Sequence, residues 1–408
     1  MTYKTAFRPA DILLPKCEDM SKWSVVACDQ YTSEPEYWQK VDAYVGSAPS
    51  ALRLILPEIY LGKPDTADRI NGINKAIREY LAAGLFRELK NAMIYVERTQ
   101  SDGKIRRGII GAIDLEEYDY RPGSRSQVRA TEATVVERIP PRLAIRKDAE
   151  IELPHIMILI DDPEMSVIEP FAGKPLEPLY DFDLMAGGGH IKGSLLRDAD
   201  IAAVDSALGA LKEKSEMLFA MGDGNHSLAT AKEHYEQLKR DNPGKDMSNH
   251  PARYALCEIV NLHSDALEFE AIHRIVKVED TYKFIFEMSL ALGLSGVPSG
   301  QRVKIHRNYT VRDLYIGEPL SKLSVGSVQA FLDSWLKENG GEIDYIHGDD
   351  VLKRLATESG TIGFEFEPMK KEELFPAVIA DGALPRKTFS MGHAEDKRYY
   401  LEARKIVL

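Results

Sequence analysis

The chain has 408 residues, of which 44% are hydrophobic and 28% charged, so it is long enough for two or three globular domains with sizeable cores. Its net charge of -12 argues against a nucleic-acid-binding surface, which needs clustered Lys and Arg. Its three cysteines form no C-x-x-C pair, which fits a reducing compartment and excludes a disulfide scaffold. No apolar run is long enough to cross a bilayer, and the first residues lack the pattern of a signal peptide, so we expect a cytoplasmic protein without a membrane partner.

The first 150 residues predict a helix and a hairpin. Up to about Tyr60 the pattern has no clear period, and apolar residues then recur at helical spacing at Ile70, Ile73, Ile77, Leu81 and Leu85. Two strand-like runs follow, in AMIYVERTQSDGKIRRGIIGAIDLEEY, and Asp102-Gly103 forms the turn between them. A helix packed on a hairpin indicates an α/β or α+β fold with mixed sheets and flanking helices.

Between residues 120 and 142 the chain is rich in arginine. Arginines alternate here with Glu132, Glu137 and small polar residues, at positions Arg121, Arg125, Arg129, Arg138 and Arg142. Surface salt bridges explain such a pattern, and we favour that interpretation. The alternative is an arginine-lined wall of an anion pocket, because a guanidinium can bind phosphate or carboxylate through two hydrogen bonds.

Two polar segments follow that we interpret as turns. The buried strand predicted at His155–Ile160 ends in Asp161-Asp162-Pro163, which could bind magnesium but is equally a turn sequence. Gly187-Gly188-Gly189 precedes His190 and Lys192, but it lacks the spacing of a phosphate-binding P-loop, so a hinge or tight turn is the better explanation. A helix is predicted from Asp198 to Lys214.

The segment from Glu216 to Arg240 combines a strand, a polar loop and a helix. Residues 217–221 are all apolar, and the helix is indicated by Leu228, Ala231, Tyr235 and Leu238. The loop between them reads Gly222-Asp223-Gly224-Asn225-His226-Ser227. A helix that begins after two glycines leaves its first backbone N–H groups unpaired, and such a helix end attracts anions.

The rest of the chain alternates strands and helices. Strands are predicted in RYALCEIVNL and FEAIHRIVKV, the latter with His273-Arg274 at its centre, then a helix at 282–292 and a linker at 295–300. A strand near Ile343, a helix at 349–355, a strand at 361–366, a helix at 372–380 and a closing strand RYYLEARKIV follow. We predict an N-terminal domain at 1–150, a central domain at 151–294 and a C-terminal portion at 295–408.

Two chemistries fit the central loop poorly. Gly222-x-Gly224 resembles the start of a dinucleotide fingerprint, but Ser227 stands at the third glycine position and Asp223 would repel a pyrophosphate. A metal site could combine Asp223 and His226 with a distant histidine, among His250, His263 and His273. No recognisable metal-binding motif supports that hypothesis.

Phosphoryl transfer fits the loop better. Backbone N–H groups at the helix start would bind a phosphate, and Ser227, as a capping residue, could add its hydroxyl. Asp223 could act as general base or bind magnesium, while His226 balances the charge on the transferred group. Asp-Gly-Asn is also a turn sequence and Ser an ordinary helix cap, so a plain connection between strand and helix stays an alternative.

The order of segments resembles the bacterial family of unknown function DUF1015. The resemblance rests on FRPADILLP, VACDQYTSEPEYW, RATEATVVERIPPR, MGDGNHSLATAKEHYE, AIHRIV and LPRKTFSMG. Typical members carry Ala-Asp-Gly-His-His-Arg at the central motif. This chain keeps Asp223, Gly224 and His226 but has Asn225 at the first His and Ser227 at the Arg.

The central motif is similar to the Asp-Gly-His-His-Arg loop of free serine kinases in the ParB/sulfiredoxin-like superfamily. The resemblance implies a core of that fold and a nucleotide-dependent phosphotransferase, or a phosphate-ester enzyme, acting on a small metabolite such as serine or phosphoserine. Magnesium and a nucleotide are the implied cofactors. With Ser227 in place of Arg, the positive charge would come from Arg129, Arg138, Arg274 or Lys387, in a pocket that also includes Glu132 and His273. A metabolite sensor and a metal-dependent hydrolase are the alternative functions.

Overall fold

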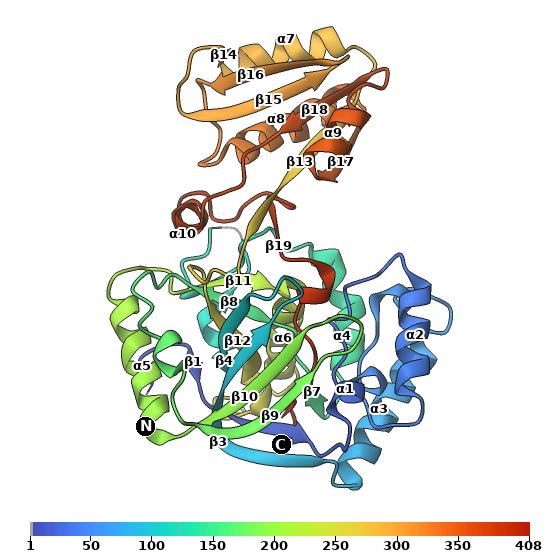
Figure 1. The fold of residues 1–408 in the computed structure, drawn as a ribbon, viewed down its shortest axis with the longest axis vertical. Coiled ribbons are helices and arrows are strands. Elements are labelled where there is room, and N and C mark those ends of the chain that lie inside the picture. The colour runs from blue at the N-terminus through green and yellow to red at the C-terminus, as the bar shows by residue number, and fades with distance from the viewer. Residues whose placement is uncertain (1–2, 122) are drawn as a thin grey trace. The chain divides into compact units, whose positions relative to one another are not determined.

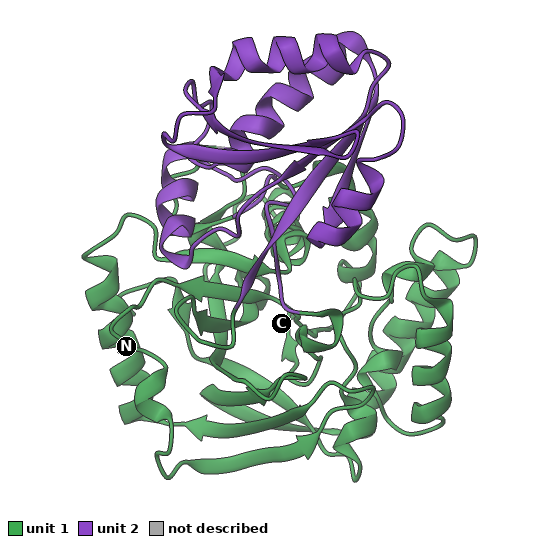
Figure 2. Cartoon of the chain, turned by 45° about the horizontal axis from the view of Figure 1, so that its top comes forward, with its two compact units in different colours: residues 1–130, 134–267, 393–408 green, residues 131–133, 268–392 purple. Residues whose placement is uncertain are grey.

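The computed structural model describes residues 3–121 and 123–408, which form two compact units (Figure 2). Unit 1 comprises Met1–Ala130, Thr134–Leu267 and His393–Leu408, and unit 2 comprises Thr131–Ala133 and Glu268–Gly392. The chain therefore leaves unit 1 after Leu267 and returns to it at His393. The three-domain division at residues 150 and 294 stays a prediction.

The described residues of unit 1 form a sheet of eleven strands in the order β5-β6-β11-β8-β12-β4-β3-β10-β9, with β1 on β4 and β2 on β3. Most neighbours are antiparallel, whereas β12 on β8, β11 on β6 and β5 on β6 are parallel. The strands are β1 (Phe7–Arg8), β2 (Ala10–Pro15), β3 (Phe86–Thr99), β4 (Ile105–Asp114), β5 (Tyr118–Asp119), β6 (Val128–Arg129), β8 (Met157–Ile160), β9 (Glu177–Asp183), β10 (His190–Leu196), β11 (Phe219–Asp223) and β12 (Tyr254–Asn261). A separate pair joins β7 (Ile151–Glu152) to β20 (Arg404–Lys405).

Alternating side chains divide unit 1 into two cores, one on each face of this sheet. On β3, Ile94 and Val96 belong to one core, and Met93 and Tyr95 belong to the other. This is the period of two that a strand buried on both faces requires. The sheet is therefore covered by helices on both sides.

The two cores use different helices. The first core contains apolar residues of α2 (Pro35–Val45) and α3 (Thr66–Ala82), and the second contains those of α5 (Asp198–Lys212) and α6 (Asn225–Asp241). Figure 1 shows α2 and α3 on one flank of unit 1 and α5 on the opposite flank. Two further helices are α1 (Met20–Trp23) and α4 (Ile139–Arg146), of which α4 packs against α6.

Unit 2 is a smaller α/β unit. Its described residues form a sheet in the order β14-β16-β15-β18-β13-β17, with β19 on β13. The strands are β13 (Phe269–Lys277), β14 (Leu294–Ser295), β15 (Gln301–Arg307), β16 (Thr310–Ile316), β17 (Glu342–His347), β18 (Thr361–Glu365) and β19 (Phe389–Met391), and the helices are α7 (Thr281–Leu292), α8 (Ser324–Asn339), α9 (Asp349–Leu355) and α10 (Leu374–Asp381). The mixed α/β fold class predicted from the sequence is confirmed.

The last segment of the chain corrects one sequence prediction. RYYLEARKIV was predicted as a strand, but only Arg404 and Lys405 lie in a strand, while Tyr399 and Ala403 make isolated bridges to Val26 and Leu13. The segment is instead held by buried charged side chains. Arg398 donates from Nε to Glu258 at 3.0 Å, from Nη2 to Glu402 at 2.8 Å and from Nη1 to the carbonyl of Pro154 at 2.6 Å.

None of the helices formed by the described residues has the length and apolar character needed to span a bilayer.

Replacing Arg398 by Met should strongly destabilise the protein, by about 3–5 kcal/mol, because buried Glu402 would lose its cation and buried Glu258 would keep only Arg106, at 3.7 Å. The measurement is the free energy of unfolding in urea. Lys405→Met, at an exposed position of the same segment, is the control and should stay within about 0.5 kcal/mol of wild type. A similar small change for Arg398→Met would show that this ion cluster does not hold the segment.

Candidate functional site

The loop from Gly222 to Ser227 lies where β11 ends and α6 begins, as predicted. The pairing of β11 with β8 shifts register between Met221 and Asp223, so Gly222 occupies a bulge. Gly224 is the N-cap of α6 and has a φ of 78°. A Cβ atom at Gly224 would lie 3.1 Å from the Cα of Ile156, so both the backbone conformation and the close packing require glycine here.

The helix start differs from the prediction at Ser227. Gly224 rather than Ser227 is the capping residue, and no side chain caps α6. Ser227 lies within the first turn, and its Oγ is hydrogen-bonded to Nε2 of His155 at 3.1 Å. The other ring nitrogen of His155 is 2.9 Å from the hydroxyl of Tyr400. The prediction of Ser227 as a cap is therefore wrong, because its hydroxyl belongs to a Ser-His-Tyr chain of hydrogen bonds.

Asp223 has a cationic neighbour. Its Oδ1 accepts a hydrogen bond from the backbone N–H of Gly224 at 2.8 Å, and its Oδ2 lies 3.6 Å from Nζ of Lys397. Asp29 is a second carboxylate close enough for its charge to act on His226. Burial alone would raise the pKa of Asp29, but His155, a hydrogen bond from Gln30 and Lys397 outweigh it and lower that pKa.

His226 is a neutral imidazole near neutral pH. Burial, together with the positive charges of Arg142 and Arg138, lowers its pKa to about 4. Before a ligand binds, His226 is therefore uncharged and does not have the positive charge that its suggested role requires. Nε2 of His226 and Oδ1 of Asn225 are both buried and make no hydrogen bond among the described residues. Because unpaired buried polar atoms are costly, these two atoms are candidates for contacting a ligand.

The two other predicted residues of unit 1 have different environments. Arg129 is buried on β6 and donates to Glu216 at 3.3 Å and to the carbonyl of Ser126 at 3.0 Å. These contacts favour a structural role. Arg138 is exposed and acts on His226 through its charge, together with Arg142 of α4. The arginine-rich segment thus contains structural salt bridges and also a source of positive potential beside the loop.

The remaining predicted residues, Glu132, His273, Arg274 and Lys387, belong to unit 2. The backbone N–H of Lys387 donates to Glu132 at 3.1 Å. Arg274 is fully buried and donates to Gln329 and to three backbone carbonyls, including that of Lys387. Both ring nitrogens of His273 are engaged, with Asp349 at 2.8 Å and with the N–H of Phe366 at 3.2 Å. These contacts give His273 and Arg274 structural tasks within unit 2.

The metal hypothesis receives no support from the histidines of unit 1. His263 pairs with Asp161 at 2.6 Å, and His250 accepts a hydrogen bond from the backbone N–H of Ala252. Among the residues that the structure describes, no group of three or more His, Cys, Asp or Glu side chains could hold a metal ion.

The glycine-rich segment Gly187–Gly189 and the acidic segment at Asp161–Asp162 are both turns, as predicted. Gly187–Gly189 connects β9 to β10, with Gly187 and Gly189 at positive φ, and Asp162 accepts hydrogen bonds from Ser166 and Val167.

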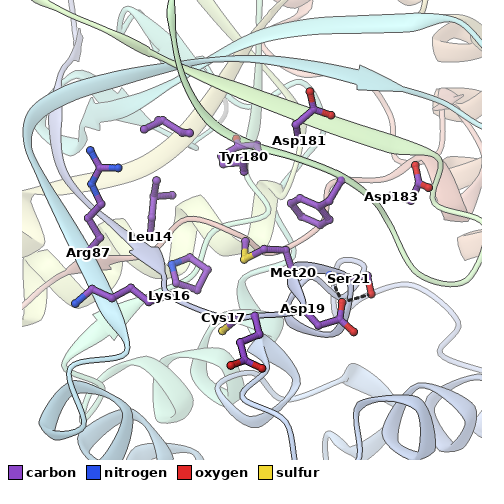
Figure 3. Close-up of a pocket in the computed structure, with 14 residues that line it drawn as sticks. Leu14, Lys16, Cys17, Asp19, Met20, Ser21, Arg87, Tyr180, Asp181 and Asp183 are labelled. Carbon is purple, nitrogen blue, oxygen red and sulfur yellow. Dashed lines mark hydrogen bonds between the residues drawn. The ribbon is translucent and has the colours of Figure 1, made fainter.

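A cavity of about 550 Å³ lies between the end of β2, the following segment and β9 (Figure 3). It contains none of the loop residues. Figure 3 shows Lys16 and Arg87 on one side of it and Asp181 and Asp183 on the other. Because none of the loop residues lines it, this cavity is separate from the candidate site.

Four residues around the loop were not among the predicted site residues: Asp29, His155, Lys397 and Tyr400. The sequence marks two of them: Asp29 directly follows the apolar run Val25–Cys28, and His155 directly precedes the apolar run Ile156–Ile160. Lys397 and Tyr400 have no such signal, because their proximity to the loop depends on the return of the chain to unit 1.

Comparison with known proteins places the chain in a family. The model of DUF1015, a protein family of unknown function, matches residues 8–339, so the chain belongs to the DUF1015 family. A search of the curated proteins found no match.

Solved structures resemble the chain only distantly. A free serine kinase in complex with AMP has a TM-score of 0.39 and 12% identity over 74% of this chain and 93% of that one. A variant of free serine kinase in complex with ADP has a TM-score of 0.40 and 13% identity over the same shares, 74% and 93%. SbnI with a C-terminal truncation, from Staphylococcus aureus, has a TM-score of 0.37 and 8% identity over 69% of this chain and 82% of that one. At these TM-scores the likenesses carry no argument about the site.

Replacing Gly224 by Ala should destabilise unit 1 by about 1–2 kcal/mol, because alanine is strained at this φ and its Cβ meets Ile156. Urea denaturation measures the change. Gly72→Ala, in the middle of α3 where a Cβ meets nothing within 4 Å, is the matched control and should be neutral or stabilising by about 0.5–1 kcal/mol. Equal effects of the two substitutions would contradict the geometry of the loop.

Stability should fall as the pH drops from about 6.5 to about 4, in part through His226. Its folded-state pKa lies near 4, below the ordinary value of 6.5, so the unfolded chain binds more protons in this window. His226→Gln should weaken this loss by roughly 1 kcal/mol at pH 5, a figure discounted for the partial exposure of the ring.

Thermal unfolding of wild type and variant at pH 7, 6 and 5 gives the comparison. His393→Gln removes an exposed imidazole and controls for the loss of one histidine. Parallel pH profiles for wild type and His226→Gln would refute a neutral, buried His226.

Proposed function

We propose that this protein is a phosphotransferase that moves a phosphoryl group between a nucleotide and a small metabolite, with the phosphate bound at Gly222–Ser227. The observation that carries the proposal is the buried Nε2 of His226, which has no hydrogen-bond partner among the described residues, at an α6 start that no side chain caps. A bound phosphate would accept hydrogen bonds from this ring nitrogen and from the first backbone N–H groups of the helix. The buried Oδ1 of Asn225 is an acceptor and would instead take a hydrogen bond from a ligand hydroxyl.

The phosphate would lie at the start of α6. There the N-terminal end of the helix supplies partial positive charge, and the nearby cations Arg142 and Arg138 add to it. These groups compensate for the arginine that typical family members carry at the position of Ser227. A phosphate beside His226 would also favour protonation of that ring and would so counteract its low pKa.

Asp223 is the proposed general base. The hydroxyl oxygen of the acceptor attacks the terminal phosphorus, its proton passes to a carboxylate oxygen of Asp223, and the bond from phosphorus to the bridging oxygen of the nucleotide breaks, so the diphosphate leaves with that electron pair. Lys397, 3.6 Å from Asp223, would stabilise the charge that develops on the transferred group.

Magnesium fits this site only together with the nucleotide. Mg²⁺ commonly uses one or two carboxylates plus substrate phosphates, and Asp223 and Asp29 are the carboxylates available. When bound, the ion would neutralise phosphate charge. Orienting the acceptor and accepting its proton remain tasks of this chain's own residues.

Nucleotides should stabilise the protein against heat. AMP, ADP and ATP at 100 times their Kd should each add about 2.7 kcal/mol, and an increase in Tm with and without magnesium measures it. Inorganic phosphate is the control for simple anion binding. No stabilisation of the wild type by any nucleotide or by phosphate would sink the proposal.

Asp223→Asn should lower the rate of phosphoryl transfer by about 10²- to 10⁴-fold while leaving the fold intact. Transfer from ATP is measured with serine and other small hydroxyl compounds as acceptors, and in the reverse direction with phosphoserine. Asp350→Asn, at a fully exposed aspartate of α9, is the matched control and should leave the rate unchanged. A wild type that binds nucleotides but transfers nothing to any acceptor would instead be a sensor.

A further inference from the structure

A second cavity, of about 150 Å³, adjoins the loop within unit 1. Ser227 and Thr230 of α6 line it, together with His155 and Tyr400, so the Ser-His-Tyr chain forms part of its wall. Ser227 thereby belongs both to the proposed phosphate site and to this cavity.

The rest of the wall is mostly aliphatic. Side chains from α3, α4, β7 and the segment before α3 contribute it, among them Leu54, Leu56, Ile73, Ile77, Ile145 and Ile151. Apolar cavities of about 150 Å³ hold a molecule of benzene's size, about six heavy atoms. The wall therefore suits a short, branched hydrocarbon chain.

The charges of the wall balance, but one arginine N–H is left to bind an acid. Arg142 and Arg146 line the cavity, each paired with a carboxylate, Glu58 or Glu152. Nε of Arg146 is buried and has no hydrogen-bond partner among the described residues. A buried N–H without an acceptor is unfavourable, and a ligand carboxylate would supply one with opposite charge.

We propose that this cavity binds a short aliphatic carboxylate of about four to six carbons. The carboxylate is recognised by Arg146 and the hydrocarbon tail by the aliphatic wall. Its role as acceptor rests on the proposed function: a hydroxyl on such an acid, near Ser227, would receive the phosphoryl group. Serine lacks the tail that would fill the aliphatic wall, so the lining favours an aliphatic hydroxy acid over serine.

Titration of the wild type with acetate, propionate, isovalerate and serine, followed calorimetrically, tests binding. The affinity should rise about fourfold for each added methylene up to isovalerate, and serine should bind more weakly than isovalerate. Isovaleramide, equal in shape but uncharged, should bind about tenfold more weakly than isovalerate. No saturable binding of isovalerate, or equal binding of acetate and isovalerate, would overturn the proposal.

Ala149→Leu locates the binding site. Ala149 lines the cavity, so the larger side chain should fill it and weaken isovalerate binding by tenfold or more. Ala82→Leu, the same change at an exposed position of α3, should leave the affinity unaltered. Unchanged isovalerate binding by Ala149→Leu would place the ligand elsewhere and refute the assignment.

Nucleotide binding separates this proposal from the proposed function. If nucleotides stabilise the protein and isovalerate does not bind, only the cavity assignment fails. If isovalerate binds and no nucleotide or phosphate does, the phosphotransferase proposal fails and the cavity assignment stands. Ala149→Leu should keep the nucleotide-induced increase in Tm, which also verifies that the variant is folded.

Discussion

The buried guanidinium of Arg398 is the contact on which much of unit 1 depends. It joins Glu258 of the central strand β12 to Glu402 of the last segment, and Glu402 in turn accepts a hydrogen bond from Tyr180 of β9 at 2.6 Å. Removing one member of such a buried group leaves the others without compensation. The cluster therefore fixes the returning chain in one register, and with it the positions of Lys397 and Tyr400 beside the loop.

Local patterns were sufficient for much of the fold. The helix α3, the hairpin of β3 and β4, and the succession of β11 and α6 follow from apolar spacing and turn residues, and the structure confirms them. Helix α8 escaped prediction although Val325, Val328 and Leu332 recur at helical spacing. The closing strand was predicted wrongly because apolar and aromatic residues there alternate with Arg398, Glu402 and Arg404, whose buried ion pairs no local pattern reveals.

The candidate site was predictable only in its continuous part. Asp223, His226 and the glycines around them are neighbours in sequence, so one motif contains them all. Asp29, His155 and Lys397 come from three distant segments, and their electrostatic relation to the loop arises only on folding. The change of role for Ser227 has the same origin, because its partner His155 lies 72 residues away in the sequence.

The interruption of unit 1 by unit 2 has a consequence for synthesis on the ribosome. Domains generally fold in order as the chain emerges, but Lys397 and Tyr400 are made only after Gly392, the last residue of unit 2. A nascent chain that already contains the whole central loop still lacks Lys397, the neighbour of Asp223, and Tyr400, the hydrogen-bond partner of His155. The time needed to translate unit 2 is thus a built-in delay before unit 1 can acquire a complete site.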